Sequence, residues 1–213
     1  MKSSLTQRQV VILISGRGSN MRSLIDQSRE PGAPYTVCRV FSDKPDAAGL
    51  DLARSLGVPA QALPAAATAD RAAYDRALAA AIQIYSPSLI VLAGFMRILS
   101  AQFVKDFAGK LLNIHPSLLP AFPGLHAQRK ALQYGVSVAG CTVHFVDESV
   151  DGGVIILQRT AEVLPEDTEE TLSERILEQE HLAYVEALQR VLSGEYEARG
   201  RRYLPIAVET TAS

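Results

Sequence analysis

The sequence predicts an α/β fold, a doubly wound and mainly parallel sheet with an antiparallel C-terminal extension. Residues 10–15 and 89–93 are continuous apolar runs of strand length, the pattern of parallel strands that helices cover on both faces. Residues 138–146 and 154–163 flank a glycine turn like the arms of a hairpin, which predicts antiparallel pairing. Together these observations indicate a Rossmann-like sheet extended by a hairpin.

The bulk composition favours one domain that binds small molecules. The chain has 213 residues, and we expect a single domain over residues 1–213 with frayed tails at 1–9 and 206–213. Its 21 basic and 23 acidic residues nearly cancel, so no net field attracts nucleic acid or a membrane. The N-terminal residues lack the apolar stretch of a signal peptide, and no apolar run approaches the ~20 residues that span a bilayer. We expect a cytoplasmic protein, and the sequence leaves open a monomer or a homodimer.

Two cysteines, Cys38 and Cys141, lie far apart, each within an apolar strand pattern. A disulfide framework or a zinc site would need more cysteines at closer spacing, so two buried thiols in a reducing compartment are the simpler interpretation. The sequence shows no histidine, cysteine and carboxylate cluster at metal-ligand spacing. We therefore expect no metal.

A glycine loop, residues 16–20 with the sequence GRGSN, separates the first apolar run from a predicted helix. Glycines let the backbone approach a ligand closely, and the free N–H groups of a helix N-terminus attract an anion. The loop lacks the third glycine of the dinucleotide fingerprint, and no clear ribose-binding acid follows the second strand. The pattern therefore favours a monophosphate site over an NAD site. A plain strand-to-helix turn is the alternative.

The next two strands and helices are predicted from apolar runs and from the residues that punctuate them. Residues 35–42 form the second strand, and Asp46 and Gly57 are candidates for the N-cap and the stop of the helix that follows. Residues 58–63 form a short third strand. Residues 71–85 form a long helix with one apolar stripe.

An apolar loop follows the strand at residues 89–93. Met96, Ile98 and Leu99 are apolar, and only Arg97 interrupts them. Loops normally face water, so apolar side chains at the carboxyl end of a strand need a reason, and a flat apolar ligand such as a pterin supplies one. Ordinary packing of a strand-to-helix connection is the alternative.

The strand at residues 110–115 carries most of the predicted chemistry. Asn113 and His115 point to the same side, because alternate residues of a strand share a face. Pro116 cannot continue a ladder, so both side chains lie at the carboxyl end of the strand, where open α/β sheets bind ligands. An imidazole can transfer a proton near neutral pH, and a carboxamide N–H can stabilise an oxyanion. On spacing alone, a capping asparagine and a satisfied core histidine are equally good interpretations.

The C-terminal part offers two further acidic residues whose ordinary interpretation is structural. Asp151 opens the DGG turn at residues 151–153, and Asp-Gly is among the strongest hairpin signals. Asp167 or Thr168 is expected to cap the final long helix. That helix carries Glu180, for which exposure at the surface is the simplest interpretation.

Residues 113–120 (NIHPSLLP), followed by FPG at 122–124, resemble the signature of the folate-dependent formyltransferases. The likeness extends from Val10 to Leu204. Within the family, the chain most resembles the members that formylate 5'-phosphoribosylglycinamide (GAR) in de novo purine (IMP) biosynthesis. The resemblance implies the formyltransferase fold and an enzyme that transfers the formyl group of 10-formyltetrahydrofolate to the amine of GAR. The products would be formylglycinamide ribonucleotide and tetrahydrofolate. The co-substrate is the folate, and no metal is implied.

The resemblance also implies roles for individual residues. The implied catalytic residues are Asn113, His115 and Asp151. The aspartate favours the charged imidazolium and helps to move the amine proton towards the departing folate nitrogen. The residues implied to bind GAR are Gly18, Ser19, Asn20 and Glu180. Those implied to bind the folate are Arg71, Met96, Arg97, Ile98 and Leu99, together with Asn113 and Asp151, and His144 is a supporting residue.

Other functions stay open on these motifs. A formyltetrahydrofolate deformylase shares the same three residue types and adds an N-terminal domain, and a methionyl-tRNA formyltransferase adds a C-terminal domain for tRNA. We expect neither addition in a chain of 213 residues. A non-catalytic binder of a phosphate ligand is the alternative from another class. Arg17 stands where some members of the family carry Asn, and its effect on phosphate affinity is left open.

Overall fold

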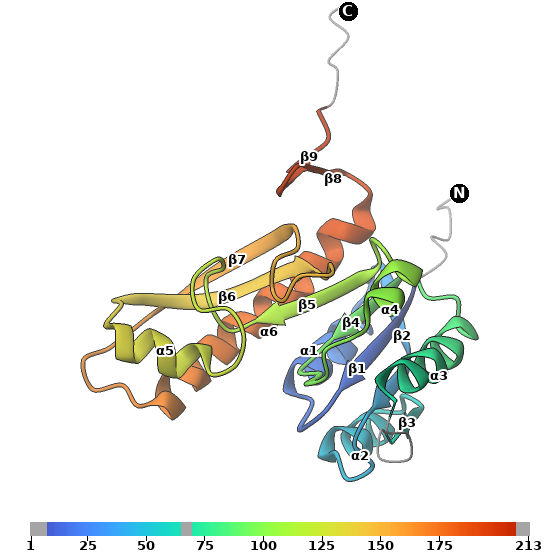
Figure 1. Cartoon of the computed structure of the whole chain (residues 1–213). Coiled ribbons are helices and arrows are strands. Elements are labelled where there is room, and N and C mark those ends of the chain that lie inside the picture. Colours follow the sequence, from blue (N-terminus) through green and yellow to red (C-terminus); the bar gives the residue numbers. More distant parts are fainter. Residues whose placement is uncertain (1–7, 65–69, 208–213) are drawn as a thin grey trace, which may run out of the picture.

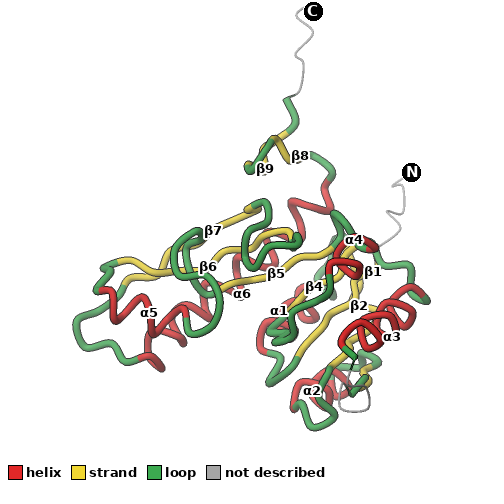
Figure 2. Tube along the Cα trace, in the orientation of Figure 1, coloured by secondary structure: helices red, strands yellow, loops and turns green. Residues whose placement is uncertain are grey.

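One sheet organises the residues that the computed structural model describes, which are 8–64 and 70–207. Within them nine strands run in the order β3-β2-β1-β4-β5-β6-β7-β9-β8 (Figures 1 and 2). Strands β1 to β5 pair in parallel, whereas β6 pairs antiparallel with both β5 and β7. The predicted mainly parallel sheet with an antiparallel extension is confirmed.

The first half of the chain alternates strands and helices. Its elements are β1 (Arg8–Ile14), α1 (Ser19–Gln27), β2 (Tyr35–Ser42), α2 (Ala48–Ser55), β3 (Ala60–Ala62), α3 (Arg71–Gln83), β4 (Leu89–Leu92), α4 (Ala101–Asp106) and β5 (Leu111–His115). Strand β1 pairs with β2 on one side and with β4 on the other, so the winding reverses between β1 and β4. Open α/β sheets bind ligands beside such a reversal, at the carboxyl ends of the strands.

The second half of the chain adds the antiparallel strands and the longest of the described helices. Its elements are α5 (Ala127–Tyr134), β6 (Val138–Phe145), β7 (Ile155–Glu162), α6 (Glu169–Ser193), β8 (Tyr196–Arg199) and β9 (Arg202–Pro205). In the antiparallel register, His144 lies opposite Asn113 and Thr142 lies opposite His115. Thr168 caps α6 as predicted, with its hydroxyl accepting from the N–H of Thr171. The register therefore brings a second histidine beside the polar side chains of β5.

Two apolar cores hold the helices to the sheet. Val10, Ile12 and Ile14 of β1 face the core that includes α1, α2 and α6, whereas Val11 and Leu13 face the core that includes α3 and α4. This alternation within one apolar run is what a strand buried on both faces requires. In Figure 1, α6 runs behind β5, β6 and β7, and α3 and α4 lie on the side towards the viewer.

The predicted ends of α2 are half right. Gly57 follows the helix in the left-handed region with φ of 69°, as expected of a stop residue. The prediction that Asp46 is the N-cap is wrong, because Ala47 occupies that position without a side-chain cap. The N–H of Gly49, in the first turn, instead donates to the carbonyl of Gly16 at 3.0 Å. The glycine loop after β1 thus takes over part of the capping of α2.

The predicted frayed tails are partly wrong. Arg8 and Gln9 belong to β1 and pair with β2. At the other end, the N–H of Ile206 donates to the carbonyl of Glu195 at 2.8 Å, next to the β8–β9 hairpin. The remaining tail residues, except Ala207, lie outside the described part of the chain.

Candidate active site

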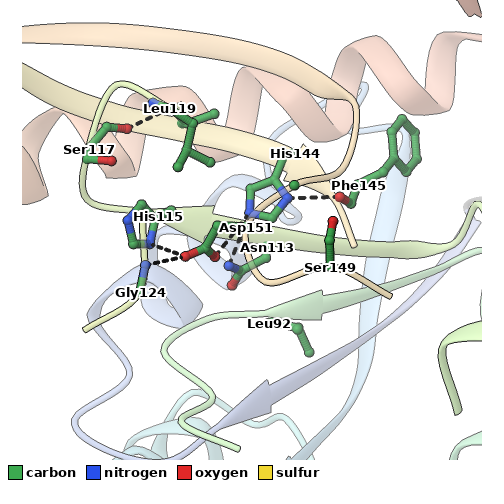
Figure 3. Close-up of polar contacts among 12 residues, drawn as sticks. Leu92, Asn113, His115, Ser117, Leu119, Gly124, His144, Phe145, Ser149 and Asp151 are labelled. Carbon is green, nitrogen blue, oxygen red and sulfur yellow. Dashed lines mark hydrogen bonds and ion pairs between the residues drawn. The ribbon is translucent and has the colours of Figure 1, made fainter. Parts of the chain in front are cut away.

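Side chains from three separate segments meet at the carboxyl end of β5. Asn113 and His115 come from β5, His144 comes from β6, and Asp151 reaches them from the β6–β7 loop (Figure 3). One Asp151 oxygen lies 3.4 Å from Nδ1 of His115, and the other lies 3.8 Å from Nε2 of His144. The side chains of His115 and Asp151 are only 8% and 11% exposed. The structure therefore brings the predicted catalytic residues and the supporting histidine into one group shielded from water.

Both ring nitrogens of His115 face acceptors. Its Nε2 lies 2.9 Å from the carbonyl oxygen of Phe122, and a carbonyl only accepts, so Nε2 carries a proton. Its Nδ1 lies 3.4 Å from the carboxylate of Asp151. These two contacts fix the orientation of the ring.

Asp151 is held in place by backbone contacts. The N–H of Gly124 donates to Oδ2 of Asp151 at 2.8 Å, and Asp151 itself adopts a left-handed φ of 53°. Gly153 packs directly on the backbone of β6, since an added Cβ would overlap the carbonyl oxygen of Phe145. Asp151 does lie in a hairpin connection, as the DGG pattern predicts, but its side chain points at His115 as well.

His144 orients the amide of Asn113. Its Nδ1 lies 2.8 Å from the carbonyl oxygen of Phe145, so Nδ1 carries the proton and Nε2 is left as an acceptor. Burial lowers the pKa of His144, which keeps the ring neutral. Nδ2 of Asn113 lies 3.3 Å from that Nε2 and donates to it. One of the two amide N–H groups is therefore fixed, and the other keeps a defined direction.

The glycine loop after β1 forms the start of α1. Gly18 is the N-cap with a left-handed φ of 78°, and no side chain caps the helix there. A Cβ there would lie 2.9 Å from Cε of Met21 and 3.2 Å from Cα of Gly49, so a larger residue would be both strained and crowded. The first N–H groups of α1, beginning with Ser19, thus lack a side-chain cap, as an anion site at a helix N-terminus requires. Arg17 is exposed.

Asn20 and Glu180 join the glycine loop to α6. Nδ2 of Asn20 donates to Oε2 of Glu180 at 2.7 Å, and the two residues are 7% and 8% exposed. Burial raises the pKa of Glu180 to about 7, and the hydrogen bond from Asn20 opposes that shift. Among the described residues no group pairs with the buried Oδ1 of Asn20. Glu180 is therefore buried beside the glycine loop and is not the exposed glutamate that its helical position suggested.

The loop after β4 combines exposed and buried apolar side chains. Met96 and Ile98 are 69% and 65% exposed, whereas Leu99 is buried. Nη2 of Arg71, the first residue of α3, donates to the carbonyl of Leu99 at 2.7 Å. Arg71 therefore contacts the loop of residues 96–99, and the structure brings together these residues for which the resemblance implies folate binding.

Arg97 packs against α3. Its guanidinium lies 4.4 Å from the ring centroid of Tyr74, and its buried Nε has no partner among the described residues. The stacking fixes the side chain beneath the loop. Any contact of Arg97 with a ligand in this position would come mainly from its backbone.

A comparison with protein families matches the model described as "Formyl transferase" over residues 8–188, most of the chain. The chain belongs to the formyl transferase family. Phosphoribosylglycinamide formyltransferase of Escherichia coli (strain K12) is 49% identical over 175 residues, which are 82% of this chain and 82% of that protein. Glycinamide ribonucleotide transformylase 1 from Symbiobacterium toebii, a crystal structure, matches with a TM-score of 0.92 and 46% identity over 96% of each chain.

Longer relatives contain a similar segment. "Trifunctional purine biosynthetic protein adenosine-3" of Bos taurus is 49% identical over 186 residues, which are 87% of this chain but only 18% of that protein. The protein of the same name from Drosophila melanogaster is 46% identical over 193 residues, which are 90% of this chain but only 14% of that protein. The formyltransferase described here thus corresponds to a small part of those proteins.

Two supports of the formyltransferase site have no signal in the sequence pattern. The hydroxyl of Tyr184 on α6 lies 3.1 and 3.0 Å from the carbonyl oxygens of Leu92 and Leu112, where β4 and β5 reach the site. Nη2 of Arg201, in the terminal hairpin, donates to the carbonyl of Gly152 beside Asp151. The position of Tyr184 four residues after Glu180, on the same helix face, is the one pattern that could have indicated it.

Within residues 8–64 and 70–207, no three or more histidine, cysteine or carboxylate side chains form a group that could hold a metal ion. None of the helices in those segments is long and apolar enough to cross a membrane.

Proposed function

We propose that this formyltransferase transfers the formyl group of 10-formyltetrahydrofolate to the amine of GAR, giving formylglycinamide ribonucleotide and tetrahydrofolate in de novo purine biosynthesis. The observation that carries the proposal is the convergence of Asn113, His115 and Asp151 at the end of β5. The likeness to proteins named phosphoribosylglycinamide formyltransferase supports the choice of substrates.

The first step is attack of the GAR amine on the formyl carbon. A carbon–nitrogen bond forms, and the electron pair of the carbonyl moves to its oxygen. The free N–H of the Asn113 amide stabilises that oxyanion by donating a hydrogen bond to it, and the positive charge of the His115 imidazolium stabilises it electrostatically. The neutral His144 fixes the amide in the orientation that makes this donation possible.

The second step is collapse of the tetrahedral intermediate. The oxyanion re-forms the carbonyl, the bond to the folate nitrogen breaks, and that nitrogen takes up a proton. The attacking amine loses one proton in the same overall step, so protons balance. Asp151 keeps His115 charged and assists this transfer, which we assign to a water between the amine and the folate nitrogen.

The acceptor substrate is proposed to bind at the start of α1. The phosphate of GAR accepts hydrogen bonds from the backbone at Gly18, Ser19 and Asn20, in the positive end of the helix dipole. Glu180 and the unpaired Oδ1 of Asn20 are buried acceptors, and they suit the N–H or O–H donors of the rest of the ribonucleotide.

The folate is proposed to bind against the loop after β4. The exposed Met96 and Ile98 side chains provide an apolar surface for the flat ring, and the backbone from Met96 to Leu99 provides hydrogen bonds. Arg71 holds the far end of the loop. Asn113 and Asp151 border the same space from the other side.

The reaction is tested with purified protein and 10-formyltetrahydrofolate, followed spectroscopically with and without GAR. We expect tetrahydrofolate only when GAR is present, with formylglycinamide ribonucleotide formed in equal amount. Rapid release of formate without GAR would make water the nucleophile and the protein a deformylase. Binding of both ligands without turnover would make it a binding protein.

Compartment and assembly are also proposals. We infer a cytoplasmic enzyme, which the free thiols of Cys38 and Cys141 support, because such thiols persist in a reducing compartment. The active unit is a monomer or a homodimer, and light scattering at assay concentration distinguishes the two. Neither nucleic acid nor a metal is part of the proposed reaction.

A further inference from the structure

One serine hydroxyl connects the loops that follow three strands of the sheet. Ser15 directly follows β1 and is 5% exposed. Its Oγ donates to Oδ1 of Asp43, after β2, at 2.6 Å, and accepts from the N–H of Met96, after β4, at 2.8 Å. Its backbone N–H donates to the carbonyl of Gly94 at 3.0 Å. Ser15 therefore links the start of the glycine loop to the loop of Met96 through hydrogen bonds.

The direction of these bonds follows from the donors available. A hydroxyl has one proton and two lone pairs, and a carboxylate only accepts. The proton of Ser15 therefore points to Asp43, and a lone pair remains for the N–H of Met96. Donation to a charged acceptor polarises the hydroxyl and strengthens it as an acceptor. Asp43 thus acts on Met96 through Ser15.

The loop from Gly94 to Ser100 is fastened at both ends by different elements. At its far end, the N–H of Ser100 donates to Oδ2 of the buried Asp75 at 2.6 Å, and Arg71 donates to Leu99. Both partners belong to α3. At its near end the side-chain contact is Ser15, which precedes the glycine loop. Loss of the hydroxyl would leave the N–H of Met96 without this partner, while α3 still held the far end of the loop.

The glycine loop does not depend on the Ser15 hydroxyl. Its backbone is held by the bond from the N–H of Gly49 to the carbonyl of Gly16, and by close packing of Gly18 on Gly49. Replacing Ser15 by alanine leaves its own N–H to Gly94 intact. The two loops can therefore be perturbed separately.

We infer that Ser15, oriented by Asp43, is a positioning residue that sets the loop of Met96 for folate binding. The inference rests on the proposed function, which assigns that loop to the folate. It predicts a specific weakening of the folate site when the hydroxyl is removed, and a much smaller change at the GAR site.

The test compares S15A with the wild type. We expect the KM for 10-formyltetrahydrofolate and the Kd for tetrahydrofolate, measured by calorimetry, to rise roughly five- to thirtyfold, the usual effect of one buried hydrogen bond. The KM for GAR should change little. D43A should shift the folate constants in the same direction by less, and S15A/D43A should resemble S15A alone, because both changes remove one chain of bonds.

S28A is the matched control. Ser28 is also a buried serine, and its hydroxyl donates a hydrogen bond of similar length, 2.7 Å, to the backbone carbonyl of Ile25. Its loss should lower thermal stability without changing the folate constants. An unchanged Kd for tetrahydrofolate in S15A, or equal rises in both KM values, would overturn the inference. A wild type that does not bind tetrahydrofolate would instead refute the proposed function.

Discussion

Two carboxylates of the proposed site, Asp151 and Glu180, lie in opposite environments. Asp151 belongs to a loop, yet its oxygens face the N–H of Gly124 and the rings of His115 and His144. Glu180 belongs to a central turn of α6, and the hydrogen bond it receives comes from the neutral amide of Asn20. Burial raises the pKa of Glu180 to about 7, so at neutral pH its charged form is disfavoured by its surroundings.

The difference separates a part of the proposed site whose polar groups are paired within the protein from a part where a ligand must supply a partner. Asp151 has its partners within the protein, which are the N–H of Gly124 and the two histidine rings. The arrangement proposed to act on the formyl group is therefore organised before substrate binds. Glu180 accepts a hydrogen bond from Asn20, whereas the buried Oδ1 of Asn20 has no donor among the described residues. A substrate that supplies an N–H or O–H group would satisfy that oxygen. The unpaired oxygen costs free energy in the free protein, and this cost increases selectivity for such a substrate.

The largest effect is expected when His115, beside Asp151, is replaced. His115→Ala should lower turnover by ~10²–10⁴, the usual contribution of a positioned acid–base group, because the oxyanion loses the positive charge proposed to stabilise it. The control is H126N, since His126 is an exposed histidine with a left-handed φ of 57° that asparagine tolerates. Steady-state kinetics measure both variants. Near wild-type turnover in H115A would remove His115 from the mechanism.

Asn113→Ala should have the next largest effect. The loss of an oxyanion donor should lower turnover by ~10²–10³ with little change in the KM for GAR. Because His144 fixes the amide, H144F should reproduce part of this loss while Asn113 is still present. Kinetics that are unchanged in N113A would show that the asparagine only caps the strand.

Asp151→Asn tests whether the loop carboxylate acts through charge. The side chain keeps its size and can still accept from Gly124, but it no longer favours the imidazolium of His115. Turnover should fall at neutral pH, because the carboxylate charge that stabilises a positive charge on His115 is lost. Turnover equal to that of the wild type would make Asp151 a turn residue alone.

Glu180→Gln should give the smallest effect, visible as a change of stability with pH. Because burial raises the pKa of Glu180 from 4.5 to about 7, its favourable contribution is fully present below 4.5 and is lost as the pH rises through 7. The unfolding free energy of E180Q minus that of the wild type should therefore increase between these pH values, by on the order of 3 kcal/mol at most.

Urea denaturation at a series of pH values measures this difference. His144, whose pKa burial lowers, acts with the opposite sign: its contribution is present above its ordinary value of 6.5 and is lost as the pH falls. That contribution is common to both proteins and cancels. E178Q, at an exposed position of α6, is the control. A difference that does not vary with pH would show that Glu180 stays charged in the free protein.

The sequence predicts well those features that depend on short-range pattern. The apolar runs locate β1, β4 and β5, and Pro116 ends β5 beside His115, as the structure confirms. What it does not predict depends on contacts between distant segments. Glu180 meets Asn20, 160 positions earlier, only because α6 packs beside α1, and nothing in its helical spacing distinguishes it from an exposed residue. The bond between Ser15 and Asp43 likewise depends on the pairing of β1 with β2.

The central claim is transfer of the formyl group from the folate to GAR without release to water. It is tested most directly by following a heavy-carbon label placed in the formyl group of 10-formyltetrahydrofolate. The enzyme is mixed with the labelled folate and GAR, and the products are observed by carbon NMR. We predict that the label appears in formylglycinamide ribonucleotide in an amount equal to the tetrahydrofolate formed. Label that accumulates as formate while GAR remains unmodified would contradict the account.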